Sequence, residues 1–243
     1  MAMAHQSDAV LAAVGLAACV ATVVGGTMAL WLADRIHLIL GFSAGAVVGV
    51  ALLDLAPEAL TLGREAVGVQ GVMTVVAIGF LVYLIVGRTL AMLSRGEARH
   101  RGHFGAASLA AHSVLDGVGI GLGFQASAAV GLALAVAVLV HDLADGANTV
   151  NLSLEGSGDR RIAGRWLAAD AVAPLVGIVA SRFITPPAGV LAVVLALFAG
   201  FFLCIGASDL LPESHRRHPR PWTTVATVLG AAMIWGVVRL SGS

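Results

Sequence analysis

The sequence contains no lysine and few charged residues of any kind. Its 14 basic residues, all arginine, and its 14 acidic residues make up only 12% of the 243 residues, against about 25% in an ordinary soluble domain. The formal net charge is zero, so no basic excess indicates a nucleic-acid partner. Apolar residues reach 58% and the mean hydropathy is +0.94. These values argue against a soluble globular enzyme and against a disordered chain.

Cysteine is almost as scarce as lysine. The chain has two, Cys19 and Cys204, and both lie in apolar runs. Two cysteines are too few for a disulfide framework or a cysteine-based metal cluster. We interpret both as small residues of the apolar core.

Long apolar runs, by contrast, fill most of the chain. A transmembrane helix needs about 20 predominantly apolar residues. The sequence predicts eight such spans, at residues 9–33, 38–60, 71–93, 104–125, 128–152, 164–183, 188–211 and 222–240. The connections are short, so we expect residues 1–243 to form a single transmembrane transport domain. We interpret 9–33 as a span because no basic stretch precedes it and it exceeds the roughly 7–15 residues of a signal-peptide core.

The arginines predict the orientation of the spans. If the N-terminus lies outside, eleven arginines fall in or near the inside connections and three near the outside ones. The inside set is Arg35, Arg88, Arg95, Arg99, Arg101, Arg160, Arg161, Arg165, Arg216, Arg217 and Arg220, and the outside set is Arg64, Arg182 and Arg239. This bias predicts that both termini face the outside of a plasma membrane or bacterial inner membrane.

The acidic residues have no such basic partners. Those within or at the edges of the predicted spans are Asp54, Glu58, Asp116, Asp142, Asp145, Asp170, Asp209 and Glu213. A charge at the bilayer centre costs about 2.5–3.5 kcal/mol on insertion scales. Protonation, water in a cavity or a bound cation relieves this cost, and all three indicate a pathway for protons or metal ions. For Asp54, Glu58, Asp209 and Glu213, an end-of-helix position facing water is an equally weighted alternative.

Two successive spans carry the same His-x-x-x-Asp-Gly pattern. It begins at His112 and ends with Asp116 and a glycine in the fourth span, and it recurs from His141 to Asp145 in the fifth. Residues at i and i+4 share one helix face, so each pair can reach one ion. Imidazole and carboxylate groups bind Zn²⁺, Mn²⁺ and Fe²⁺. Two antiparallel neighbours joined by a short turn can bring both pairs to one divalent ion. The alternative is hydrogen bonding between helices.

Further polar residues extend this face. Asp142 shares a side of the helix with Asp145, and it can line a second, adjacent site with Ser113 opposite. Asn148 and Asn151 continue the polar stripe beyond Asp145. We expect these asparagines either to line a transport pathway or to hydrogen-bond between helices.

A short motif is repeated in the second and seventh spans. Residues 54–58 read Asp-Leu-Ala-Pro-Glu, and residues 209–213 read Asp-Leu-Leu-Pro-Glu. The two spans run in opposite directions, which is typical of the inverted repeats of alternating-access transporters. We therefore expect an all-α polytopic membrane protein with eight transmembrane helices in a 3+2+3 arrangement. Helices 1–3 and 6–8 form the inverted repeat around helices 4–5.

These features together resemble the ZIP (Zrt/Irt-like) family of divalent metal transporters. The fourth-span sequence from His112 to Gly121 looks like the His-Asn-x-x-Asp/Glu-Gly signature of that family. The fifth-span sequence from His141 to Gly146 is similar to its partner signature. The resemblance covers almost the whole chain and includes the eight spans and the outside termini.

The resemblance implies a binuclear metal centre and no enzymatic activity. The implied ligands are His112, Asp116, His141 and Asp145, with Asp142 and Ser113 at positions of the second metal. The implied substrate is Zn²⁺, with Cd²⁺, Fe²⁺ or Mn²⁺ as further candidates. The metal passes into the cytoplasm, through a homodimer in the lipid bilayer and by an elevator-like or rocking movement. His100 and His103 are candidates for receiving released metal, or else are solvated surface residues.

The sequence also departs from the family pattern. Leu115 and Ala144 occupy positions where the family often has proline before the acid. The sixth span has Ala173 before Pro174, where some members have glutamate, and Asp170 one turn earlier is a candidate substitute. Both motif acids are aspartate, which is one methylene shorter than glutamate. We therefore expect the second metal position to be less well formed than the first.

Three other functions fit part of the pattern. A cation-diffusion-type metal exporter also uses two intramembrane His-x-x-x-Asp pairs, but it has six spans and a soluble C-terminal domain. An intramembrane metal-dependent hydrolase needs an open metal position and a general base, a role that Asp116 could fill, but the repeated motif has no place in it. A purely proton-coupled transporter is the third alternative.

Overall fold

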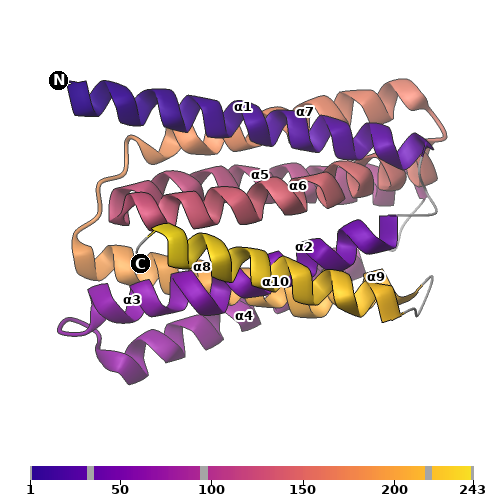
Figure 1. The fold of residues 1–243 in the computed structure, drawn as a ribbon. Coiled ribbons are helices and arrows are strands. Elements are labelled where there is room, and N and C mark those ends of the chain that lie inside the picture. Colours follow the sequence, from indigo (N-terminus) through magenta and orange to yellow (C-terminus); the bar gives the residue numbers. More distant parts are fainter. Residues whose placement is uncertain (1, 32–35, 94–97, 217–220, 242–243) are drawn as a thin grey trace. The chain divides into compact units, whose positions relative to one another are not determined.

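The structure is a computed structural model that describes residues 2–31, 36–93, 98–216 and 221–241. The described residues are helical apart from short connections, and they include no β-strand (Figure 1). In chain order the elements are α1 (Ala2–Trp31), α2 (Ile36–Val50), η2 (Ala51–Leu55), α3 (Ala56–Gly63), α4 (Gly68–Leu93), α5 (Ala98–Ala126), α6 (Ala128–Ser157), α7 (Arg160–Ser181), α8 (Ala188–Cys204), η3 (Ile205–Leu210), α9 (Leu211–Arg216) and α10 (Pro221–Ser241).

Eight segments of these helices are long and apolar enough to cross a membrane. They are Ala9–Ala29, His37–Gly63, Gly68–Leu90, Gly102–Ala126, Ala128–Leu154, Arg160–Ser181, Ala188–Arg216 and Pro221–Leu240. The predictions of an all-helical chain and of eight spans are thereby confirmed, and the eight helices mark an integral membrane protein. The seventh span extends to Arg216 rather than to residue 211, because its helix continues through the repeated proline motif.

The chain divides into two compact units. The first contains residues 1–33, 93–121 and 142–184, and the second contains residues 34–92, 122–141 and 185–243. In the first unit α1 contacts α7, and in the second α2 contacts α10 and α3 contacts α8. The helices α5 and α6 contribute to both units. The single transport domain and the 3+2+3 arrangement stay predictions.

Glycine allows α2 and α10 to pack closely in the second unit. A Cβ atom added at Gly45 would overlap the carbonyl oxygen of Thr227, and one added at Gly230 would overlap that of Phe42. Both overlaps involve backbone atoms, so a side chain at either glycine would push the helices apart. Such small-residue contacts are a common way for transmembrane helices to associate.

Both copies of the repeated Asp-Leu-x-Pro-Glu motif adopt the same backbone structure. In each copy, an α-helix is followed by a π-helical segment. This segment is η2 in the second span and η3 in the seventh. In each copy, the N–H group of the residue before the proline donates a hydrogen bond to the carbonyl oxygen of the residue five positions earlier. Ala56 donates to the carbonyl of Ala51, and Leu211 donates to that of Gly206.

The prolines explain why these segments leave the α-helical pattern. Pro57 has no N–H group to donate to the carbonyl four residues earlier, and its ring would clash with that carbonyl in a regular α-helix. Pro212 has the same effect in the seventh span. A π-helical turn relieves the clash without ending the helix, and such turns are frequent at functional sites. The motif therefore has a structural consequence that is the same in both spans.

We expect Gly45→Ala to destabilise the protein by about 1–3 kcal/mol, the usual cost of overpacking. The added methyl group meets the backbone of α10 and cannot be accommodated by a side-chain rotation. Thermal unfolding in detergent measures the effect. Gly236→Ala is the matched control, because no atom lies within 4 Å of the added methyl group. Equal midpoints for the two variants would contradict the close α2–α10 contact.

Candidate metal centre

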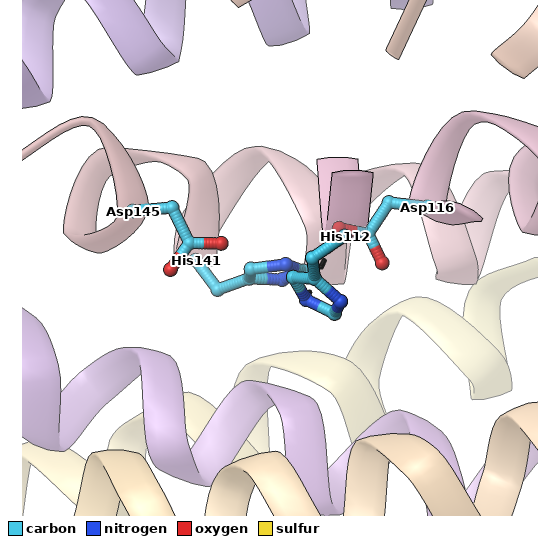
Figure 2. A group of neighbouring side chains, drawn as sticks. All are labelled: His112, Asp116, His141 and Asp145. Carbon is cyan, nitrogen blue, oxygen red and sulfur yellow. Dashed lines mark ion pairs between the residues drawn. The ribbon is translucent and has the colours of Figure 1, made fainter. Parts of the chain in front are cut away.

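Four predicted ligands lie together on α5 and α6. Ligand atoms of His112, Asp116, His141 and Asp145 all lie within 4.8 Å of one another. Figure 2 shows the two imidazole rings next to each other, with the carboxylate of Asp145 at one end and that of Asp116 at the other. Because Zn²⁺ binds nitrogen and oxygen at about 2.0–2.2 Å, two ligand atoms of one ion lie at most about 4.4 Å apart. Small side-chain rotations would therefore close the group around an ion.

The group is shielded from solvent. Asp116 and Asp145 are 1% and 5% exposed, and His141 is fully buried. The side chain of His112 keeps 11% of its surface accessible, and its Nε2 lies 3.3 Å from Oδ2 of Asp116. Two carboxylates and two imidazoles at such depth are costly unless a proton or a cation balances their charge. His112 is therefore the most accessible of the four.

The ring of His141 is oriented by its surroundings. Its Nδ1 lies 3.2 Å from the carbonyl oxygen of Ala137, one turn earlier on α6. A carbonyl oxygen only accepts hydrogen bonds, so this contact places a hydrogen on Nδ1. The ring also packs edge-on against Phe202, with 5.9 Å between the centroids. A histidine held in this way by a backbone carbonyl is typical of metal-binding histidines.

The glycine after Asp116 brings α5 against α7. A Cβ atom added at Gly117 would overlap the carbonyl oxygen of Pro174, and one added at Gly177 would overlap that of Val114. The contact is thus reciprocal, with one glycine from each helix facing the backbone of the other. The final glycine of the fourth-span motif is a packing residue that fixes the ligand-bearing turn of α5.

The glycine after Asp145 has the same role between α6 and α1. A Cβ atom added at Gly146 would overlap the carbonyl oxygen of Thr22, and one added at Gly25 would overlap that of Leu143. The two motifs therefore end in the same kind of contact, made with different partner helices. This explains why glycine follows the aspartate in both.

Ser113 and Asp170 lie outside the four-residue group and contact each other. The Ser113 hydroxyl donates a hydrogen bond of 2.7 Å to Oδ1 of Asp170. The hydroxyl of Thr149 donates a second bond of 2.7 Å to Oδ2 of the same carboxylate. Both predicted residues are therefore adjacent to the ligand-bearing turns, where they belong to a hydrogen-bonded network.

The other residues predicted near the centre also lie outside the group. Asp142 is fully buried beside His141 on α6. Asn148 and Asn151 are half-buried on the following turns of the same helix. Their predicted roles in a second metal position and in a pathway stay predictions.

The repeated acidic motif has two different environments. Asp54 is 3% exposed, so it does not face water at a helix end, whereas Asp209 is exposed and Glu58 is half-buried. Glu213 accepts a hydrogen bond of 2.8 Å from Arg216 at the protein surface. The alternative of water-facing acids therefore fits Asp209 and Glu213 better than it fits Asp54.

The histidines predicted to receive metal are only partly described. The side chain of His100 lies outside the described residues. Nδ1 of His103 accepts a hydrogen bond of 2.9 Å from Nε1 of Trp166 on α7. This bond leaves only Nε2 of His103 as a possible ligand atom, and in the neutral ring that nitrogen carries the hydrogen.

Sequence reasoning missed three features of the site. Thr149 lies one turn after Asp145, so the i+4 spacing that revealed the ligands could also have revealed this residue. The carbonyl of Ala137 follows the same spacing on the other side of His141. Phe202, by contrast, comes from a different span, and nothing in its local sequence indicates contact with His141.

Comparison of the chain with models of known protein families gave no match, and comparison with curated proteins gave none either. The resemblance to the ZIP family therefore stays a prediction that depends on the motifs of the fourth and fifth spans.

We expect Gly117→Ala to weaken Zn²⁺ binding by about 10- to 100-fold, the range found when groups supporting metal ligands are altered. The added methyl group pushes α5 away from α7 and moves the turn that carries His112 and Asp116. Isothermal titration of the purified protein with Zn²⁺ measures the change. Gly164→Ala on α7 is the control, because its methyl group meets no atom within 4 Å. Equal affinities in the two variants would contradict this role of Gly117.

Proposed function

We propose that this protein transports divalent metal cations, Zn²⁺ first among them, across a membrane and into the cytoplasm. The ion binds to His112, Asp116, His141 and Asp145 on its way. The observation that carries the proposal is the convergence of these four side chains within 4.8 Å on two membrane-spanning helices. Cd²⁺, Fe²⁺ and Mn²⁺ are further candidate substrates, because a mixed imidazole and carboxylate site accepts several metals.

A transported ion accounts for the burial of the group better than polar packing does. Serine, threonine or asparagine would supply interhelical hydrogen bonds at a lower desolvation cost than two carboxylates. The histidines are also suited to release an ion, because protonation of the imidazole competes with metal binding. The carboxylates of the group thus attract a divalent cation, and protonation of its imidazoles would release that cation.

The organisation of the chain supports movement around this group. The two proline motifs share a π-helical backbone. This similarity supports an inverted repeat in which membrane spans one to three and six to eight flank spans four and five. The division into two compact units is compatible with an elevator-like or rocking movement. The proposed orientation, with both termini outside, rests on the arginine count, and the proposed homodimer rests on the family resemblance.

Hydrolysis is a weaker explanation of the same residues. A metal-dependent hydrolase needs an open position on the metal and a separate general base. If Asp116 were that base, three ligands would remain, but its carboxylate lies 3.3 Å from His112 and within the four-residue group. Transport uses all four residues in one role, so it is the simpler proposal.

We expect His112→Ala combined with Asp145→Ala to abolish Zn²⁺ and Cd²⁺ uptake into proteoliposomes. The double variant removes one imidazole and one carboxylate, one from each ligand-bearing helix. Uptake is followed with a fluorescent zinc indicator inside the vesicles. The control is His215→Ala combined with Glu65→Ala, which removes the same number of histidine and acidic side chains outside the group. Full uptake by the first variant would contradict the proposed function.

A further inference from the structure

We infer that Asp170 is a positioning residue of the metal centre, which holds the two ligand-bearing helices at a fixed spacing through the hydroxyl groups of Ser113 and Thr149. We call these three residues the Asp170 clamp. The inference deepens the proposed function and rests on it, because it names what sets the geometry of that same site.

Both oxygens of the Asp170 carboxylate take part in this clamp. Ser113 donates to one oxygen and Thr149 donates to the other, each over 2.7 Å. Lengths near 2.7 Å are typical of well-formed hydrogen bonds from a hydroxyl to an oxygen acceptor. The exposed fractions of Asp170, Ser113 and Thr149 are 0%, 1% and 0%. Water therefore does not compete for these bonds.

The clamp joins three helices at the level of the ligands. Asp170 lies on α7, Ser113 on α5 directly after His112, and Thr149 on α6 one turn beyond Asp145. One carboxylate thus bridges the ligand-bearing turns of α5 and α6. All three clamp residues belong to the first compact unit, together with the ligands His112, Asp116 and Asp145.

The geometry favours positioning over direct metal ligation by Asp170. Its oxygens are not among the ligand atoms that lie within 4.8 Å of one another. Each of its oxygens accepts a hydroxyl hydrogen, from Ser113 or from Thr149, and this pair of contacts accounts for its position between α5 and α6. The single hydroxyl hydrogen of Ser113 has two acceptors within reach, Oδ1 of Asp170 at 2.7 Å and the carbonyl oxygen of Leu109 at 3.1 Å. The shorter contact is the one to Asp170, so we assign Ser113 to the clamp.

A fixed spacing of the two helices gives the clamp a role in metal choice. Zn²⁺ forms shorter bonds to nitrogen and oxygen than Cd²⁺ does, so a tightly held group favours Zn²⁺. When the clamp is removed, α5 and α6 are free to separate slightly, and the larger ion loses less affinity than the smaller one. Selectivity is thus a property that a purely structural hydrogen bond elsewhere in the bundle would not change.

The test measures Zn²⁺ and Cd²⁺ affinities by titration, together with the unfolding temperature of the metal-free protein. We expect Asp170→Ala and the double variant Ser113→Ala/Thr149→Val to weaken Zn²⁺ binding by about 10- to 100-fold, with a smaller loss for Cd²⁺. Asp170→Asn should lose less Zn²⁺ affinity than Asp170→Ala or the double variant. Its side-chain amide can accept a hydrogen bond from one hydroxyl and donate one to the other. Thr149→Ser, which keeps a hydroxyl, is the matched control and should bind as the unaltered protein does.

Two results would overturn the inference. If Asp170→Asn loses as much affinity as Asp170→Ala while Ser113→Ala/Thr149→Val loses none, Asp170 is a ligand. If all clamp variants keep their Zn²⁺ affinity and their preference for Zn²⁺ over Cd²⁺, the network only stabilises the fold. Thr149→Val alone, which preserves the shape of the side chain, replaces Asp170→Ala if that variant does not fold.

The clamp and the proposed function fail in different ways. An unaltered protein whose Zn²⁺ binding is lost in His112→Ala but kept in every clamp variant overturns the clamp alone. An unaltered protein that binds no Zn²⁺ overturns the proposed function and the clamp with it.

Discussion

The cost of placing ionisable side chains inside membrane-spanning helices governs this structure. His141, Asp116 and Asp145 are almost completely buried, in a region where water is not at hand to solvate a charge. Such groups persist where a proton, water in a cavity or a bound cation offsets the cost. Their convergence on α5 and α6 is the observation on which the proposed function rests. The remaining polar residues around them follow from the same constraint: His141 donates to a backbone carbonyl, and the Asp170 carboxylate accepts two hydroxyl hydrogens.

Close helix packing is what makes the convergence possible. An i, i+4 pair places an imidazole and a carboxylate on one face of a helix, but the distance between two such pairs depends on how closely the helices approach and how they are rotated. Gly117 and Gly146 let the ligand-bearing turns press against α7 and α1. Because a metal-ligand shell tolerates errors of only a few tenths of an ångström, glycines that are not themselves ligands would influence the affinity of the proposed site.

The sequence predicted most of what local spacing determines and little of what depends on helix rotation. Apolar run lengths predicted the eight spans, and the repeated His-x-x-x-Asp spacing predicted the four residues that the structure brings together. The partner of Ser113 could not be predicted, because it depends on which face α7 turns toward α5. The spacing of Asp170 along its own helix did not reveal that its carboxylate joins Ser113 to Thr149, and the contact of Phe202 with His141 had no local signal at all.

In the repeated proline motif, too, the local sequence determines the backbone geometry, whereas packing with other helices determines the burial of the acidic side chains. Pro57 and Pro212 remove the same backbone donor in each copy, so the same five-residue hydrogen bond replaces the α-helical one in both. The neighbouring acids nevertheless differ, since Asp54 is buried and Asp209 is exposed. A short sequence repeat thus fixes backbone geometry, while the packing of other helices decides whether its carboxylate meets solvent.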